Sequence, residues 1–183
     1  MKLTYNASVS QLSDFPALVE LKDGTPVLIR LLKPEDKEEL RTGFEQLSMD
    51  SRRRRFLSSK GKLSNSHLKY LTEIDQFDHF ALGAFDVGQE TIKGIGVARY
   101  IRIENEPEVA EYAITILDTY QGRGLGTTLL GLLSKAARKN GICRFRGYVL
   151  EENNSMLSML KRLGAHVQRG AGQVLRVDLV LMP

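Results

Sequence analysis

The stretch 120–127 has the composition of a loop that binds an anion. It reads Tyr-Gln-Gly-Arg-Gly-Leu-Gly-Thr, follows a β-rich run and precedes an apolar helical pattern. Glycines let the backbone turn tightly and approach a ligand, and the free N–H groups of a helix N-terminus favour phosphate. Arg123 adds a positive charge. The pattern predicts a site for a phosphate-bearing ligand; a strand–helix turn that needs glycines for its geometry alone is the alternative.

The glycine spacing excludes two common phosphate motifs. A Walker loop closes with lysine followed by serine or threonine, and 120–127 contains no lysine. The glycines stand at 122, 124 and 126, which is not the G-x-G-x-x-G spacing of dinucleotide-binding folds. The sequence therefore predicts neither a P-loop NTPase nor a Rossmann enzyme.

Glu111 is the second residue that could do chemistry. It lies in the β-rich run 108–116, where alternation places Ala110, Tyr112, Ile114 and Ile116 on one face and Glu111 on the other. A carboxylate in this position can accept a proton from an attacking amine. An exposed glutamate on a half-solvated strand is equally compatible with the pattern.

The elements that must position these residues can be predicted from periodicity and turn residues. Helices come first, then three strands, then alternating strands and helices, which predicts an α/β fold with a mixed sheet. The expected elements are a hairpin at 19–32 around Asp23-Gly24, helices at 34–47, 52–57 (capped by Asp50 or Ser51) and 64–71 (capped by Ser64 or Ser66), strands at 80–87, 91–103 and 108–116, a helix ending at Asn140, a strand at 142–150, a helix at 153–163, and a hairpin of 165–169 with 174–181.

Length and composition bound the class of protein. The chain has 183 residues, 42% of them hydrophobic, which suits one compact domain. No apolar run is long enough to span a membrane, and the N-terminus lacks a secretory pattern. The single cysteine, Cys143, favours a reducing, cytoplasmic location and is expected to pack within its strand. The isolated His67, His79 and His166 predict no metal site.

The run Arg52–Arg55 places four positive charges side by side in a chain whose formal net charge is +4. A run of four arginines without interleaved aromatic residues is more typical of a solvated helix face than of a nucleic-acid site. Docking of an acidic protein substrate, or contact with the phosphates of a cofactor, is favoured over nucleic acid. The sequence assigns no partner to the run, and it does not define an oligomeric state.

The spacing of Gln121–Gly126 resembles the Q/R-x-x-G-x-G/A signature of the GNAT superfamily of N-acetyltransferases. Three blocks are also similar to the acetyltransferase domain of Pat-type protein lysine acetyltransferases. They are IRLLKPED at 29–36 with LSMDSR at 47–52 and RRF at 54–56; AEYAI at 110–114; and VLEENNSML at 149–157 with RLG at 162–164. The resemblance implies a single GNAT domain at 25–183, preceded by a flank and first hairpin arm at 1–24, with no regulatory domain. It also implies a mixed, mostly antiparallel sheet, splayed between its central strands.

The resemblance assigns roles to individual residues. It implies acetyl-CoA as cosubstrate, Glu111 as general base, and direct transfer of acetyl to an amine acceptor, namely a lysine of an acyl-CoA synthetase-like protein. The cofactor-binding residues it implies are Ile114, Thr115, Ile116, Gln121, Gly122, Arg123, Gly124, Leu125, Gly126, Thr127 and Asn153. Asn153 is equally suited to cap the helix that follows it. Many members place a tyrosine at the position of Leu160 to protonate the leaving thiolate, so the donor for that step is unassigned.

Two other functions are compatible with the sequence. The same acetyl-CoA-binding part of the domain would serve an acetyltransferase for a small amine. Residues 50–80 and the C-terminal hairpin would then select the acceptor. A catalytically silent module that binds acyl-CoA is the third reading. A functional Glu111 argues against that reading.

Overall fold

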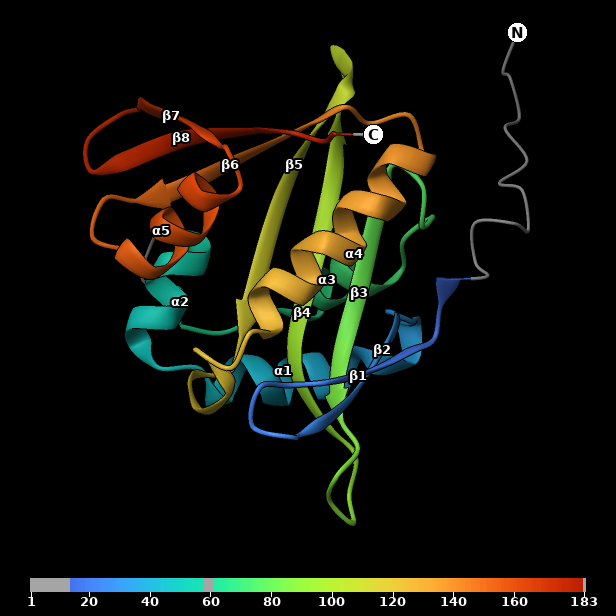
Figure 1. Ribbon diagram of the computed structural model, residues 1–183. Helices are drawn as coiled ribbons and strands as arrows, with labels where there is room; N and C mark the ends of the chain where they lie inside the picture. The colour runs from blue at the N-terminus through green and yellow to red at the C-terminus, as the bar shows by residue number, and fades with distance from the viewer. Residues whose placement is uncertain (1–13, 58–60, 183) are drawn as a thin grey trace, which may run out of the picture.

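The computed structural model describes residues 14–57 and 61–182. Residues 1–13 of the expected N-terminal flank, 58–60 and 183 lie outside the described residues. The described chain forms an eight-stranded sheet in the order β1-β2-β3-β4-β5-β6-β8-β7. Neighbouring strands are antiparallel except β5 and β6, which run parallel. Helix α4 crosses one face of the sheet, and α1 to α3 lie behind it (Figure 1). The predicted α/β fold with a mixed, mostly antiparallel sheet is confirmed.

The predicted elements are present, with bounds that differ by a few residues. The strands are β1 (Ala17–Glu20), β2 (Pro26–Leu31), β3 (His79–Asp86), β4 (Lys93–Ile103), β5 (Glu106–Ile116), β6 (Arg144–Leu150), β7 (His166–Arg169) and β8 (Val174–Val180). The helices are α1 (Lys37–Gln46), α2 (Met49–Phe56), α3 (Asn65–Thr72), α4 (Leu125–Lys139) and α5 (Asn154–Arg162), with 3-10 turns η2 (Pro34–Asp36) and η3 (Asp118–Tyr120).

The second helix begins earlier than the sequence pattern predicts. Its N-cap is Ser48 rather than Asp50 or Ser51, because the Ser48 hydroxyl accepts a hydrogen bond from the backbone N–H of Ser51 at 3.2 Å. Ser64 caps α3 in the same way through the N–H of His67. The earlier start adds a turn at the N-terminal end of α2.

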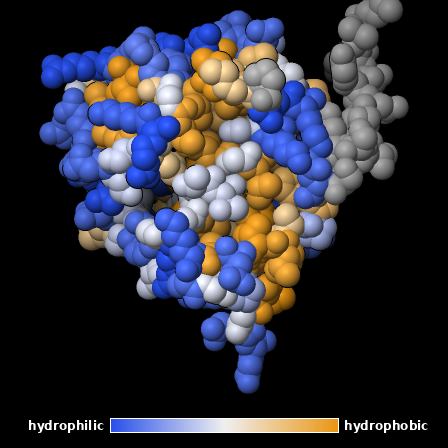
Figure 2. All heavy atoms as spheres, in the orientation of Figure 1, coloured by the Kyte–Doolittle hydropathy of each residue, from blue (hydrophilic) through white to orange (hydrophobic). Residues whose placement is uncertain are grey.

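The core includes buried residues of the sheet and of the helices on both of its faces, among them Phe44 of α1 and Leu68 of α3. Leu125, Leu129 and Leu133 of α4 are buried and belong to one cluster with Tyr100 and Tyr112 of the sheet. Seen from this side, hydrophilic side chains gather at the left and right, and apolar and neutral residues reach the surface between them (Figure 2). The predicted apolar stripe of this helix therefore packs as expected.

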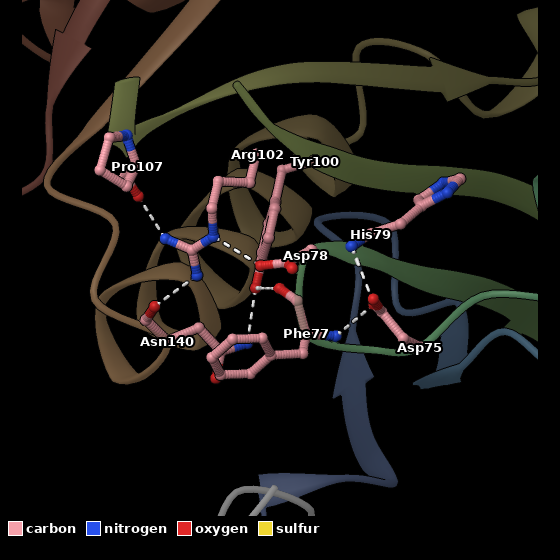
Figure 3. A network of polar contacts seen from close by, with 8 residues as sticks. All are labelled: Asp75, Phe77, Asp78, His79, Tyr100, Arg102, Pro107 and Asn140. Carbon is pink, nitrogen blue, oxygen red and sulfur yellow. Dashed lines mark hydrogen bonds and ion pairs between the residues drawn. The ribbon is translucent and has the colours of Figure 1, made fainter. Parts of the chain in front are cut away.

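A polar network fixes one end of this core (Figure 3). The Tyr100 hydroxyl donates to the carbonyl oxygen of Phe77 at 3.0 Å and accepts from the side-chain amide of Asn140 at 2.6 Å. Arg102 donates to Asp78 and to the carbonyl oxygens of Pro107 and Asn140. The network joins β3, β4 and β5 to the C-terminus of α4, near the start of β6.

The prediction that Cys143 packs within a strand is wrong. Cys143 is exposed and precedes the first residue of β6, Arg144. Ile142, one residue earlier, is completely buried. Because successive side chains in extended backbone point to opposite sides, burial of Ile142 turns the thiol of Cys143 outward.

Candidate functional site: the cleft between β5 and β6

A cleft opens where β5 and β6 separate. The strands pair over Val109–Glu111 and Arg144–Arg146 and then diverge, while β6 continues to pair with β8. The cleft has a volume of about 290 Å³ and is lined by 112–116 of β5 and 147–149 of β6, together with residues of α2, α5 and the glycine-rich turn. In Figure 1 the two strands spread apart from the top of the view, with β6 running to the left and β5 running down to the right of α5 and α2. The predicted splay of the central strands is present.

The glycine-rich turn closes one end of the cleft. Gly122 and Gly124 have φ values of 75° and 94°, a backbone region that side chains other than glycine rarely adopt. Helix α4 begins directly after Gly124, so the N–H groups of its first turn face the cleft end without helical acceptors. Gln121, Gly122, Gly124, Gly126 and Thr127 all line the cleft. This geometry is suited to an anion.

Ser48 and Ser51 of α2 hold this turn in place through Asp118. The Asp118 carboxylate accepts hydrogen bonds from the Ser48 N–H, the Ser48 hydroxyl and the Ser51 hydroxyl at 2.7–3.0 Å. Burial opposes ionisation of Asp118, but the hydrogen bonds from the serines outweigh it and lower its pKa. Gln121 adds hydrogen bonds to Ser51 and to the carbonyl oxygen of Ile116. The N-terminus of α2 therefore orders the turn.

Arg123 faces away from the cleft. Its guanidinium pairs with Asp23 at 2.7 Å and lies 4.9 Å from the ring centroid of Tyr120. Lys22, on the neighbouring hairpin, lines the cleft instead, and its ammonium has no ion pair with any described residue. Sequence reasoning used Lys22-Asp23-Gly24 as a turn signal only. The charge available to an anion at this turn comes from Lys22.

Glu111 and Tyr112 lie at the vertex of the cleft on opposite faces of β5. Glu111 is exposed, and Tyr112 is 5% exposed and packs on the α4 side. In the strand register Glu111 lies opposite Arg146 of β6, and Tyr112 is the first β5 residue beyond the paired segment. Glu111 does not itself line the cleft, whereas Tyr112, the next residue, does. The exposed carboxylate is thus one residue from the cleft and open to groups arriving from solvent.

The profile of the acetyltransferase (GNAT) domain matches residues 27–166 of the chain. The chain belongs to the GNAT acetyltransferase family. As a GNAT acetyltransferase, it uses acetyl-CoA as cosubstrate.

The chain is also similar to individual proteins and structures of the GNAT family. The chain is 35% identical over 150 residues to Acetyltransferase Pat of Mycolicibacterium smegmatis, covering 82% of this chain and 44% of that protein, so it spans less than half of that relative's length. It is 34% identical to Acetyltransferase PA5475 of Pseudomonas aeruginosa over 149 residues, which covers 81% of this chain and 80% of the relative. The crystal structure of the GNAT domain of S. lividans PAT superposes with a TM-score of 0.84 at 30% identity, covering 96% of this chain and 100% of that one.

The residues of this GNAT cleft fit acetyl-CoA. Basic side chains of Lys22, Arg54 and Arg162 line it, and the Arg54 Nε is buried without a hydrogen-bond partner among the described residues. Buried donors of this kind mark the place of an acceptor that a ligand supplies. Beyond Glu111 the β5 peptide groups that face β6 no longer pair with it, so their donors and acceptors are open to a ligand.

Two arginines of the run 52–55 bond to neighbouring elements, and the other two line the GNAT cleft. Arg52 donates to the carbonyl oxygens of Glu45 and Leu47 at the C-terminus of α1, and Arg53 pairs with Glu152 at 2.6 Å. Arg54 and Arg55 line the cleft and have no ion pair with a described residue at hydrogen-bond distance. Burial lowers the pKa of Arg55, and the charge of Glu111 opposes this effect.

The remaining predicted cofactor residues fall into three groups. Ile114, Thr115 and Ile116 line the GNAT cleft. Asn153 lines it too, and its side chain caps α5 by accepting from the Met156 N–H at 3.3 Å. The Leu125 side chain is buried in the core, so only its backbone is available to a ligand.

Neither a metal-binding cluster nor a membrane-spanning helix is found in the described parts of the chain. No cluster of three or more histidine, cysteine or acidic side chains there could hold a metal ion. None of the described helices is long and apolar enough to cross a membrane.

Proposed function

We propose that this GNAT enzyme transfers acetyl from acetyl-CoA to a lysine side chain of a protein, with Glu111 as general base. The position of Glu111 carries the proposal, because an exposed carboxylate stands at the last paired residue before β5 and β6 separate. An acceptor attached to a large protein needs a base that can be reached from solvent. Similarity to Pat acetyltransferases over most of this chain supports an acyl-CoA synthetase-like target.

The chemistry assigned to Glu111 is removal of a proton from the amine. A lysine ammonium has an ordinary pKa of about 10.4 and must lose a proton before its nitrogen can attack. Glu111 accepts this proton directly or through one water molecule, and the nitrogen forms a bond to the carbonyl carbon of the donor. Backbone N–H groups of 114–116 are proposed to stabilise the oxyanion, as buried donors do in acyl transfer.

The proposed cofactor contacts follow from the lining of the cleft. The glycine-rich turn and Lys22 hold the phosphates, and Ile114–Ile116 hold the pantetheine arm. Asn153 contacts the cofactor from the α5 side. The proposed domain, 25–183, includes every one of these elements except Lys22, which belongs to the hairpin turn just before it. A cytoplasmic location, favoured by Cys143, belongs to the same proposal.

A second acceptor class has one observation in its favour. An apolar chamber of about 80 Å³ lies between α1–α3 and the sheet, and it shares Arg55, Ala113 and Thr115 with the cleft. A small amine with a short apolar body would fit such a chamber better than a protein lysine does. Comparing acetylation of purified acyl-CoA synthetases with acetylation of a panel of small amines separates the two.

Glu111→Gln tests the assignment of the base. We expect acetyl-CoA affinity, measured by calorimetry, to stay unchanged and turnover to fall about 100-fold or more. Glu108→Gln is the matched control, because Glu108 is also exposed on β5 but lies three residues farther from the point where β5 and β6 separate. Unchanged turnover of Glu111→Gln with an acceptor that the enzyme modifies efficiently would overturn the proposal.

A further inference from the structure

Tyr112 occupies the vertex at which the two strands separate. It follows Glu111, the last β5 residue paired with β6, and Gly147 follows the corresponding Arg146. A Cβ atom at Gly147 would lie 2.7 Å from a ring carbon of Tyr112 and 3.2 Å from its hydroxyl oxygen. The tyrosine side chain therefore extends from β5 to β6 across the floor of the cleft, in space that glycine leaves open.

The hydroxyl of Tyr112 has no hydrogen-bond partner among the described residues. The residue is 5% exposed and its oxygen is buried, although it lines the cleft. Buried tyrosine hydroxyls are almost always hydrogen-bonded, because an unpaired one has lost its water without compensation. An unpaired hydroxyl on a residue that lines a ligand cleft indicates that the partner belongs to the ligand.

The order of groups along the cleft indicates which part of acetyl-CoA reaches this vertex. The turn that suits the phosphates lies at one end, and Ile114–Ile116 extend from it towards Tyr112. The thioester is the end of the molecule farthest from the phosphates, so it lies nearest the vertex. Leu160, which stands where many relatives carry a tyrosine, is fully buried and has no polar atom to offer.

We propose that the Tyr112 hydroxyl donates a hydrogen bond to the thioester sulfur of acetyl-CoA and stabilises the thiolate as it leaves. The inference rests on acetyl-CoA occupying the cleft, and it does not depend on the acceptor or on Glu111. Tyr112 is thereby a catalytic residue that replaces the absent donor at Leu160.

The proton balance of the step is simple. The amine nitrogen bonds to the carbonyl carbon, its proton passes to the base, and the carbon–sulfur bond breaks with its electron pair on sulfur. Burial raises the pKa of Tyr112, whereas an ordinary thiol has a pKa of about 8.5. Tyr112 therefore keeps its proton and acts through a charge-assisted hydrogen bond, and the thiolate takes a proton from solvent after release.

The first test follows the thiol of bound CoA, with no acceptor present. Its deprotonation is read from the ultraviolet absorbance of the thiolate as pH rises. In Tyr112→Phe the midpoint is expected about one pH unit higher than in the native enzyme, since a charge-assisted hydrogen bond shifts such an equilibrium about tenfold. Equal midpoints would overturn the proposal. Glu108→Gln, on the same strand but away from the vertex, should leave the midpoint in place. Because neither an acceptor nor a general base takes part in this titration, its outcome is independent of the proposed function.

The second test compares steady-state constants. Tyr112→Phe should lower kcat about tenfold or more and leave KM for acetyl-CoA nearly unchanged, because the hydrogen bond strengthens as charge develops on sulfur. A raised KM with unchanged kcat would contradict the assigned role. Tyr100→Phe is the matched control, because Tyr100 is a buried tyrosine of the adjacent strand that does not line the cleft. Thermal unfolding of Tyr112→Phe should be at or above that of the native enzyme, which confirms that the variant folds.

Discussion

Tyr100 of β4 and Tyr112 of β5 are paired across the two strands, and both side chains are buried in the same core. Their hydroxyls have different surroundings. The Tyr100 hydroxyl bonds to Phe77 and Asn140, whereas the Tyr112 hydroxyl is unpaired among the described residues and belongs to a residue that lines the cleft. The Tyr100 hydroxyl therefore stabilises the fold, and the Tyr112 hydroxyl is available to a ligand.

Removal of the Tyr100 hydroxyl should destabilise the fold. Tyr100→Phe leaves the Asn140 amide and the Phe77 carbonyl without their partner, at a cost of about 1–3 kcal/mol in the free energy of unfolding. Tyr112→Phe, measured in parallel by urea denaturation, should change it by less than about 0.5 kcal/mol. Equal losses in the two variants would show that Tyr112 has a partner in the folded protein.

Lys22, rather than Arg123, should supply charge to the cofactor phosphates. Lys22→Ala should raise KM for acetyl-CoA about tenfold, because it removes a cation that lines the cleft. Arg123→Ala should raise KM less than about threefold, since its guanidinium pairs with Asp23. Lys62→Ala, an exposed lysine outside the cleft, is the control. A larger effect at Arg123 than at Lys22 would reverse this assignment.

Gly147 should be intolerant of a side chain. Gly147→Ala places a methyl group 2.7 Å from the Tyr112 ring, and relief of this contact should cost about 1–3 kcal/mol and weaken acetyl-CoA binding. Gly131→Ala is the matched control, because Gly131 is an exposed position of α4 with nothing within 4 Å of its added Cβ. This control should gain about 0.5–1 kcal/mol from helix propensity. Calorimetry and thermal unfolding measure both changes.

His79 should make stability depend on pH below neutrality. Burial, together with the charge of Arg99, lowers its pKa from 6.5 to about 4. Between these values the unfolded chain binds a proton that the folded chain does not, so stability is complete above pH 6.5 and falls as pH drops towards 4. The loss should reach about 1–2 kcal/mol, allowing for the partial exposure of the ring.

The matched variant for this pH effect is His79→Gln, which keeps an acceptor for the Arg99 guanidinium that lies 3.0 Å from the ring nitrogen. The free energy of unfolding of this variant should change less with pH between pH 6.5 and 4.5 than that of the native protein. A native profile with no slope in this interval would contradict the depressed pKa.

Local signals were sufficient for the elements and for the glycine-rich turn. Gly122 and Gly124 adopt positive φ, Ser64 caps α3, and Asn153 caps α5, as their residue types favour. The start of α2 was predicted wrongly because Asp50, Ser51 and Ser48 are all good caps. Contacts with Asp118, about 70 residues away in the sequence, accompany the choice of Ser48.

The sequence by itself determined that this is an α/β acetyltransferase of the GNAT type, because strand and helix periodicity, glycine conformation and motif spacing act over short stretches of chain. Only the tertiary structure decided that Arg123 turns to Asp23 while Lys22 and Arg54 face the cleft, and that the Tyr112 hydroxyl is left unpaired among the described residues. The direction of a side chain and its partner depend on how distant strands diverge and which charges pack against them. Those relations exist only after the sheet has formed.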